Sequence, residues 1–317
     1  MINRVGGAAV AVLTMALAVG CSGLTAPHRT AAGAPVAAPL KAARSVSVEA
    51  AGVPAGIFVA SATTAARIPR YSHIVVVVLE NHSYQEIIGS RSAPFLSQVA
   101  RSGAVMTRSY AVTHPSQPNY LALFSGSTHG VSSDSCPQTL TGPNLASALR
   151  SHGHSFVGYS ESMRAVGFAG CSQGHYVRKH NPWVDFDSLP GSVSQPMNAF
   201  PLNPAKLPTV SFVVPNLQHD MHDGTIAQSD AWLRQHLGGY SSWALTHNSL
   251  LIVTADEDDR SAGNRIATIL SGAHVRPGFY GGRVTHYGIL RSVLDSYRIT
   301  GFGKAATAAR LTGMWTS

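Results

Sequence analysis

The segment HIVVVVLE (73–80) decides the fold of this chain. Six consecutive apolar residues lead into a carboxylate, a pattern typical of a β-strand that is buried on both faces of a sheet. Four further segments are apolar in the same way and end in polar residues. They are HSFVGYS (154–160), TVSFVVPN (209–216), LLIVTADE (250–257) and IATILSG (266–272).

Amphipathic patterns typical of helices lie between these segments. They cover APFLSQVARSG (93–103), NLASALRSHG (144–153), SDAWLRQHLGGY (229–240) and HYGILRSVLDSYRI (286–299). Alternating strands and helices predict an α/β domain with a largely parallel central sheet and helices on both of its faces. In such a sheet, the ligand site is expected at the carboxyl ends of the strands.

The composition agrees with a globular protein. The chain has 317 residues, of which 44% are hydrophobic and 12% charged, so it can bury a large core. Its net charge is +8, but the basic residues are scattered and not interleaved with aromatic ones. We therefore expect no nucleic-acid partner. We predict no protein partner.

The N-terminal residues predict export. One basic residue precedes an apolar run that is too short to span a bilayer, and small residues follow, as in a secretory signal covering 1–21. Cys21 follows LAVG (17–20), which is similar to a bacterial lipobox although its leucine is one place further from the cysteine than usual. Lipidation of Cys21, with membrane attachment, and plain secretion both stay open.

The remainder divides into a tether and a folded domain. Residues 22–67 are rich in Ala, Pro, Thr, Ser and Gly and predict a flexible tether, which leaves 68–317 as the folded domain. Two cysteines lie in that domain, Cys136 and Cys171. In an oxidising compartment an isolated pair without zinc-site spacing predicts one intramolecular disulfide.

Acidic residues concentrate where three predicted strands end. Glu80 ends the first run, QHDMHD (218–223) follows the third, and DEDD (256–259) ends the fourth. These places hold seven of the 15 acidic residues in the chain. Like charges at one edge of a sheet repel each other unless a cation neutralises them, so the sequence predicts a divalent metal ion there.

The turn THPSQPNY (113–120) is the second unusual feature. Ser116 lies between two prolines, just before the helical pattern NYLALFSG (119–126), and a helix N-terminus favours negative charge. This setting suits a serine nucleophile or a phosphate group, and Asn119 is placed to donate its amide to a phosphoryl oxygen. A simple capping role for Ser116 or Thr113 stays open.

Five motifs together resemble a known family. They are LENHSY (79–84), THPSQPNYLALFSG (113–126), YVRKHNPW (176–183), PNLQHDMHDG (215–224) and TADEDD (254–259). They are similar to the bacterial phosphoesterase family of acid phosphatases and phosphatidylcholine-type phospholipases C, within the alkaline phosphatase superfamily. The resemblance covers about His73 to Ile299 and implies an alkaline-phosphatase-like fold.

The resemblance also implies roles for single residues. Ser116 would be the nucleophile, with Thr113 as the alternative, and Asn119 would contact the phosphoryl group. Two imidazoles, His180 and His222, would lie near the phosphate. The metal ligands implied by the family pattern are Glu80, Asn81, Ser116, Asp256 and Glu257.

One departure from the superfamily pattern concerns a second metal. Two-metal relatives have an Asp-x-x-x-His set, whereas this chain has Asn216 and Asp220 at that spacing. We therefore expect one divalent ion, which could be calcium, magnesium, manganese or zinc. Three residues are expected to contact the metal ligands without binding the metal themselves. They are His219, Asp220 and His286.

The implied activity is metal-dependent hydrolysis of a small phosphate ester through a phosphoserine. Phosphomonoesters are the expected substrates, because we expect the chain to leave no room for the apolar lip or extra domains that a phospholipase C needs. Two alternatives stay open. One is a phospholipase C-type phosphodiesterase, and the other is a non-catalytic lipoprotein that binds phosphate-bearing ligands.

Overall fold

The computed structural model describes residues 67–316 of the chain. The predicted export signal with Cys21 and the tether up to residue 66 lie outside the described residues. Within the described range, no helix combines the length and the apolar character needed to cross a membrane.

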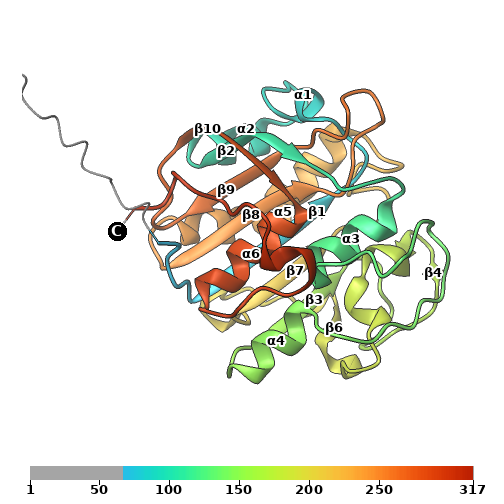
Figure 1. The fold of residues 1–317 in the computed structure, drawn as a ribbon. Helices are drawn as coiled ribbons and strands as arrows, with labels where there is room; N and C mark the ends of the chain where they lie inside the picture. Colours follow the sequence, from blue (N-terminus) through green and yellow to red (C-terminus); the bar gives the residue numbers. More distant parts are fainter. Residues whose placement is uncertain (1–66, 317) are drawn as a thin grey trace, which may run out of the picture. The chain divides into compact units, whose positions relative to one another are not determined.

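The core of the domain is an eight-stranded sheet in the order β10-β2-β9-β8-β1-β7-β3-β6 (Figure 1). The central strand β1 (His73–Leu79) pairs in parallel with β7 and β8, as predicted. Within this eight-stranded sheet, as the structure describes it, only β9 runs antiparallel to its neighbours. The other strands are β2 (Ala104–Tyr110), β3 (Phe156–Ser160), β6 (Ser194–Pro196), β7 (Val210–Val214), β8 (Ser249–Ala255), β9 (Thr268–Gly272) and β10 (Gly278–Thr285).

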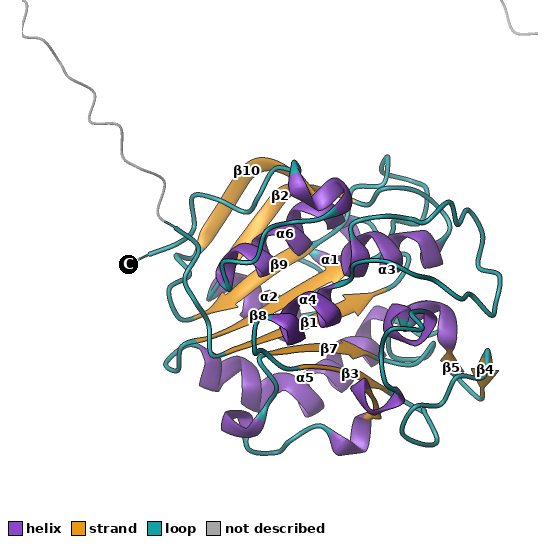
Figure 2. Ribbon diagram, turned by 60° about the horizontal axis from the view of Figure 1, so that its bottom comes forward, coloured by secondary structure: helices purple, strands orange, loops and turns teal. Residues whose placement is uncertain are grey.

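Helices cover both faces of this sheet (Figure 2). Alternate residues of β1 show why: Val76 packs into a core with α3, α4 and α6, and its neighbour Val77 packs into a core with α2 and α5. The largely parallel, doubly covered sheet predicted from the sequence is therefore confirmed. The helices are α1 (Tyr84–Ile87), α2 (Pro94–Arg101), α3 (Ser116–Ser125), α4 (Leu145–Ser151), α5 (Ile226–Ala244) and α6 (His286–Ser296).

Three strands of the sheet were not predicted. β2 and β10 contain polar, glycine or solvent-exposed positions, and β6 is three residues long and ends in proline. A search for fully apolar runs detects only strands that are buried on both faces, so it missed these edge and near-edge strands. The predicted strand 266–272 is real but shorter, and it is the antiparallel one.

Short elements complete the domain. β4 (Ser172–Gln173) and β5 (Tyr176–Val177) form a separate hairpin that leads into two short 3-10 helices, η1 (Arg178–His180) and η2 (Pro182–Asp185). The remaining 3-10 helices are η3 (Gly191–Val193), η4 (Met197–Ala199), η5 (Pro204–Lys206) and η6 (Gly303–Ala306).

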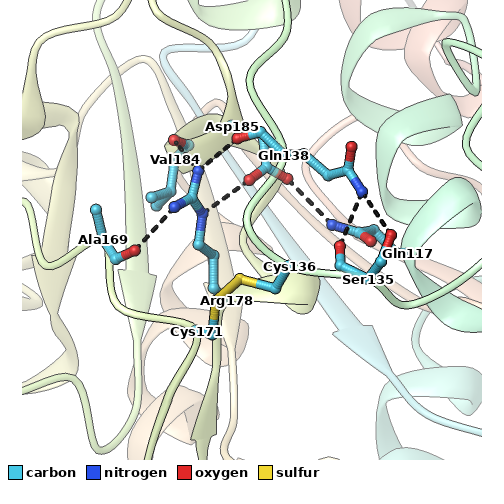
Figure 3. The surroundings of a disulfide bond; sticks show 9 residues. All are labelled: Gln117, Ser135, Cys136, Gln138, Ala169, Cys171, Arg178, Val184 and Asp185. Carbon is cyan, nitrogen blue, oxygen red and sulfur yellow. Dashed lines mark hydrogen bonds and ion pairs between the residues drawn. A yellow bond between two sulfur atoms is a disulfide. The ribbon is translucent and has the colours of Figure 1, made fainter.

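The predicted disulfide is present and lies beside η1 (Figure 3). Cys136 and Cys171 are 5.7 Å apart between Cα atoms. Next to the bridge, Arg178 donates to Asp185 Oδ1 at 2.8 Å. The other N–H groups of its guanidinium donate to the carbonyl oxygens of Gln138, Ala169 and Val184. Covalent and polar contacts thus fasten the loop around Cys136 to the segment that carries Lys179 and His180.

Candidate active site

Three strand ends bring buried carboxylates to one edge of the sheet. Glu80 follows β1, Asp220 lies in the loop after β7, and Asp256 and Glu257 follow β8. Backbone hydrogen bonds lock the segments together: Glu80 N donates to Asp220 O at 2.8 Å, and Asp256 N donates to Leu79 O at 2.9 Å. Glu80 and Asp220 are completely buried. The strand-end rule therefore located this cluster correctly.

Ser116 points into this cluster from the first residue of α3. Its hydroxyl donates to Glu80 Oε2 at 3.1 Å and lies 3.5 Å from Glu257 Oε1. Thr113, the alternative nucleophile, instead donates its hydroxyl to the adjacent carbonyl of His114. Ser116 is thus the hydroxyl that the structure brings together with the carboxylates, at a helix N-terminus that favours negative charge.

Several buried oxygen atoms in this cluster lack a partner. Asn81 Oδ1, Asp220 Oδ2 and Asp256 Oδ2 are buried and accept no hydrogen bond from the described residues. Such atoms are costly unless something satisfies them, and hard divalent cations prefer oxygen ligands of this kind. Asn81 is held in place by its backbone N–H, which donates to Asp256 Oδ1 at 3.3 Å. The residues present therefore fit a divalent metal ion.

The electrostatics of the carboxylates agree with this assignment. Burial raises the pKa of Glu80 well above its ordinary value, and repulsion from Asp256 and Asp220 raises it further. Burial also raises the pKa of Asp256, followed by repulsion from Glu257, and it raises the pKa of Asp220 to about 7. Without a counter-charge, the ionised forms of these carboxylates are unfavourable in the folded protein, and a bound cation would stabilise them.

A second candidate set shares Glu80. His180 Nε2 lies 3.2 Å from Glu80 Oε1, and His180 Nδ1 lies 3.4 Å from Asp220 Oδ2. The ligand atoms of these three buried residues all lie within 4.8 Å of one another, so the triad could also hold a metal. The His180 ring stacks on Tyr120, whose hydroxyl donates to Glu80. His180 therefore lies between two carboxylates and is closed off from solvent.

The other predicted histidines lie at different distances from the cluster. His222 is part-exposed, its Nδ1 lies 2.7 Å from Asp223 Oδ1, and its ring centroid is 6.3 Å from that of His180. His286 is buried at the start of α6, and its Nε2 donates to the carbonyl of Asp256 at 2.6 Å. Burial lowers the pKa of His286 to about 4, so it is neutral and supports the Asp256 backbone.

The structure does not bring His219 into contact with the proposed ligands. Its Nδ1 lies 3.0 Å from Glu161 Oε1, and its ring stacks on Trp232. The indole N–H of Trp232 donates to the same Glu161 oxygen at 2.8 Å. His219 thus belongs to a separate polar contact beside the loop that carries Asp220.

His114 was missed by the sequence reasoning. Its Nδ1 lies 2.8 Å from Glu257 Oε2, and its Nε2 lies 3.3 Å from Asp258 Oδ1. The imidazole thus connects the turn before Ser116 to the end of β8. Its place inside THPSQPNY was the only sequence signal for this role.

Lys179 was missed as well. Its ammonium pairs with Asp134 Oδ2 at 2.8 Å, and Asp134 Oδ1 accepts the backbone N–H of Gln117 at 2.9 Å. Burial lowers the pKa of Lys179, but the bond to Asp134 and the charges of Glu80 and Asp256 outweigh burial and raise it. The Lys179–Asp134 ion pair is therefore hydrogen-bonded, through Asp134, to the backbone of the residue that follows Ser116.

Asn119 holds the turn in front of Ser116. Its Oδ1 accepts the backbone N–H groups of Val112 and Thr113 at 3.0 and 3.2 Å. Its Nδ2 donates to the carbonyls of Thr113 and Pro115 at 2.9 and 3.1 Å, and lies 3.4 Å from Glu257 Oε2. The predicted contact with a phosphoryl oxygen would have to compete with these bonds, so that role stays a prediction.

The Asn119→Ala variant should therefore lose both rate and stability. We expect kcat to fall about 100- to 1000-fold, as for the loss of one transition-state donor, with metal content intact. We expect the free energy of unfolding to fall by about 1–3 kcal/mol, because buried backbone groups of the turn lose their partners. Asn119→Asp keeps the acceptor for Val112 and Thr113 but loses the amide donor and adds a charge beside Glu257, so it should lose stability as well. Steady-state kinetics measure kcat, and urea unfolding measures the stability. An unchanged kcat in Asn119→Ala would contradict the role of Asn119 as a donor to the phosphoryl group.

Comparisons with known proteins concern the family and the reaction class of the chain. The model of the phosphoesterase family matches residues 90–300. The chain is 50% identical to phosphatidylinositol-3-phosphatase of Mycobacterium tuberculosis over 254 residues, which cover 79% of this chain and 85% of that protein. It is 29% identical to the phosphate-repressible acid phosphatase of Penicillium chrysogenum, covering 77% of this chain and 63% of the fungal protein. The chain thus spans less than two thirds of this fungal relative.

A solved structure shows the same fold. A protein of the alkaline phosphatase superfamily from Vibrio parahaemolyticus superposes with a TM-score of 0.53 at 13% identity, covering 74% of this chain and 68% of that one. At this identity, the likeness concerns the fold alone. Together with the family match and the phosphatase relatives, it confirms the predicted fold and reaction class. The chain belongs to the phosphoesterase family and is a phosphoric ester hydrolase.

Proposed function

We propose that this protein hydrolyses phosphate monoesters with one divalent metal ion and through a phosphoserine at Ser116. The observation that carries the proposal is the position of the Ser116 hydroxyl, 3.1 Å from Glu80 Oε2 at the N-terminus of α3. A serine in this setting is buried, pre-positioned and next to an acidic cluster that needs a cation.

The residues that would hold the metal are Glu80, Asn81, Ser116, Asp256 and Glu257. The unpartnered oxygens of Asn81 and Asp256 support this set. When bound, the ion would act as a Lewis acid and would lower the pKa of the serine hydroxyl. The alternative set of Glu80, His180 and Asp220 shares one carboxylate with it.

The chain's own residues suggest an order of events. The Ser116 hydroxyl passes its proton to Glu80 Oε2, to which it donates a hydrogen bond, and its oxygen attacks phosphorus as the bond to the leaving alkoxide breaks. His222 gives that alkoxide a proton, because it is part-exposed and held by Asp223, whereas His180 is buried between carboxylates. Water then gives a proton to His222 and attacks phosphorus, and the departing Ser116 oxygen takes its proton back from Glu80, which releases phosphate and restores the Ser116 hydroxyl. Lys179, paired with Asp134, offsets part of the negative charge of Glu80 and Asp256.

The names of the relatives support monoesters as the substrates of this protein. The two similar enzymes named above are both phosphatases, one of them for phosphatidylinositol 3-phosphate. We also propose that the protein works outside the cytoplasm, secreted or attached to the cell envelope, and the Cys136–Cys171 disulfide supports an oxidising compartment. Attachment through a lipidated Cys21 stays a prediction.

A substrate panel with and without chelator tests the proposal. We expect turnover of a chromogenic phosphate monoester to exceed that of bis-p-nitrophenyl phosphate and p-nitrophenyl phosphorylcholine. A chelator should abolish turnover, and one or more of calcium, magnesium, manganese and zinc should restore it. Preference for the diesters would favour the phospholipase C alternative. Absence of turnover with every metal would favour a non-catalytic binding protein. Full turnover in the presence of chelator would contradict the proposal that the reaction needs a metal ion.

A further inference from the structure

A basic pocket lies at the end of α6 that is remote from Ser116. It has a volume of about 450 Å³ and is formed where the end of α6 meets residues 67–68 and the C-terminal segment 299–312. α6 begins at His286 beside the carboxylate cluster and has 11 residues, so it separates the two places by about 15 Å. The charged side chains that line the pocket are Arg67, Arg291, Arg298, Arg310 and Asp295.

The charges of this pocket are unbalanced. Asp295 is its only acidic lining residue and is shared: Asp295 Oδ2 lies 3.3 Å from Arg310 Nε and 3.7 Å from Arg291 Nε. Arg67 forms no ion pair with any residue that the structure describes. Four guanidinium groups therefore face one carboxylate, and the excess positive charge is concentrated around a cavity.

Two of the arginines are fixed by backbone contacts. Arg291 Nη1 donates to Ala306 O at 2.7 Å, and Arg298 Nη1 donates to Ile68 O at 3.1 Å and to Asp295 O at 2.8 Å. Arginines near a helix C-terminus commonly serve only as caps, and this explains Arg298, which donates to Asp295 O. Arg291 lies in the middle of α6, and its bonds to Ala306 O and Ala308 O fasten the C-terminal segment to the helix. Neither role explains why Arg67 and Arg310 converge on the same cavity.

We propose that this pocket binds a multiply charged phosphorylated ligand, separate from the substrate of the active site. Guanidinium groups bind phosphate through paired N–H donors, and each arginine here keeps donors beyond those used on the backbone. The phosphates could be presented by an anionic membrane lipid or by a free polyanion. Both sources share the same recognition chemistry, and the experiment below separates them.

The test compares two pairs of exposed arginines. Arg67→Gln/Arg310→Gln removes two positive charges at the pocket, and Arg101→Gln/Arg150→Gln removes two elsewhere on the surface. The probes are inorganic tripolyphosphate, measured by calorimetry, and vesicles of phosphatidylcholine with or without phosphatidic acid, measured by co-sedimentation. Chelator is present so that the active site contributes as little as it can.

We expect the pocket pair to weaken binding of at least one probe about tenfold or more, and the control pair to weaken it about twofold or less. An effect confined to phosphatidic acid vesicles identifies a lipid headgroup, and one confined to tripolyphosphate identifies a free polyanion. Equal weakening by both pairs would show diffuse surface charge and overturn the proposal, as would no binding of either probe. Turnover of a small monoester with metal should be unchanged in both pairs, so failure here is separable from failure of the proposed activity.

Discussion

The Ser116→Ala variant is expected to turn over substrate about 10⁴-fold more slowly than the wild type, or slower still, because a nucleophile has no substitute. Its fold should remain intact. The lost hydroxyl makes one hydrogen bond to Glu80, and that carboxylate keeps its contacts with Tyr120 and His180. We expect the free energy of unfolding to change by about 1 kcal/mol or less.

Steady-state kinetics and urea unfolding measure both effects. Thr113→Ala is the matched control, because its hydroxyl contacts only the neighbouring carbonyl of His114. The kcat of Thr113→Ala should stay within about threefold of the wild-type value, because substitutions outside the site usually have small effects. If Thr113→Ala loses turnover while Ser116→Ala keeps it, the nucleophile is three residues upstream.

The second large effect is expected for Asp256→Asn. Turnover and metal binding should both be lost, because the unpartnered Asp256 Oδ2 is a proposed ligand atom. The metal-free variant should nevertheless be more stable than the metal-free wild type at neutral pH. Burial and the charge of Glu257 raise the pKa of Asp256, so its ionised form is unfavourable in the folded protein.

The sign of the pH dependence follows from linkage. A carboxyl whose pKa is raised by folding stabilises the fold below its unfolded pKa of about 4, and this contribution is lost as pH rises through the folded pKa. The metal-free wild type should therefore lose stability as pH rises toward neutrality, and Asp256→Asn should lose less. Added metal should reverse the order, since it binds only the wild type.

Thermal unfolding with and without chelator, together with metal analysis, checks this result. Asp259→Asn is the control, because Asp259 lies in the same acidic run but is exposed and hydrogen-bonded to Ser261. It should change neither stability nor metal content. If Asp256→Asn keeps its metal and its turnover, Asp256 is not part of the site.

Much of this fold could be predicted because its central strands are buried on both faces. Segments such as 73–80 are apolar throughout, so the run itself reveals the strand. The strands β2 and β10 could not be found in this way, because solvent reaches some of their side chains and their sequences are mixed. The position of the acidic cluster followed from the strand ends alone, since parallel strands deliver their following loops to one edge.

The roles of single side chains were harder to predict. Lys179 is paired with Asp134, 45 residues away, and His114 with Glu257, more than a hundred residues away. Neither pairing follows from local spacing, because each depends on how loops pack over the sheet edge. The resemblance implied that His180 lies near the phosphate; the structure encloses its ring between Glu80 and Asp220, and that role stays a prediction.

The measurement that tests the central claim most directly is acid quenching during turnover of a ³²P-labelled monoester. We predict a phosphoenzyme of up to about one phosphate per chain, stable in acid as serine esters are, located at Ser116 by peptide mapping and absent from Ser116→Ala. Phosphate label on Thr113 or on a histidine would contradict the assignment of Ser116 as the nucleophile. Continued hydrolysis by Ser116→Ala at the wild-type rate, with no phosphoenzyme in either protein, would show that water attacks phosphorus directly and would contradict the covalent mechanism.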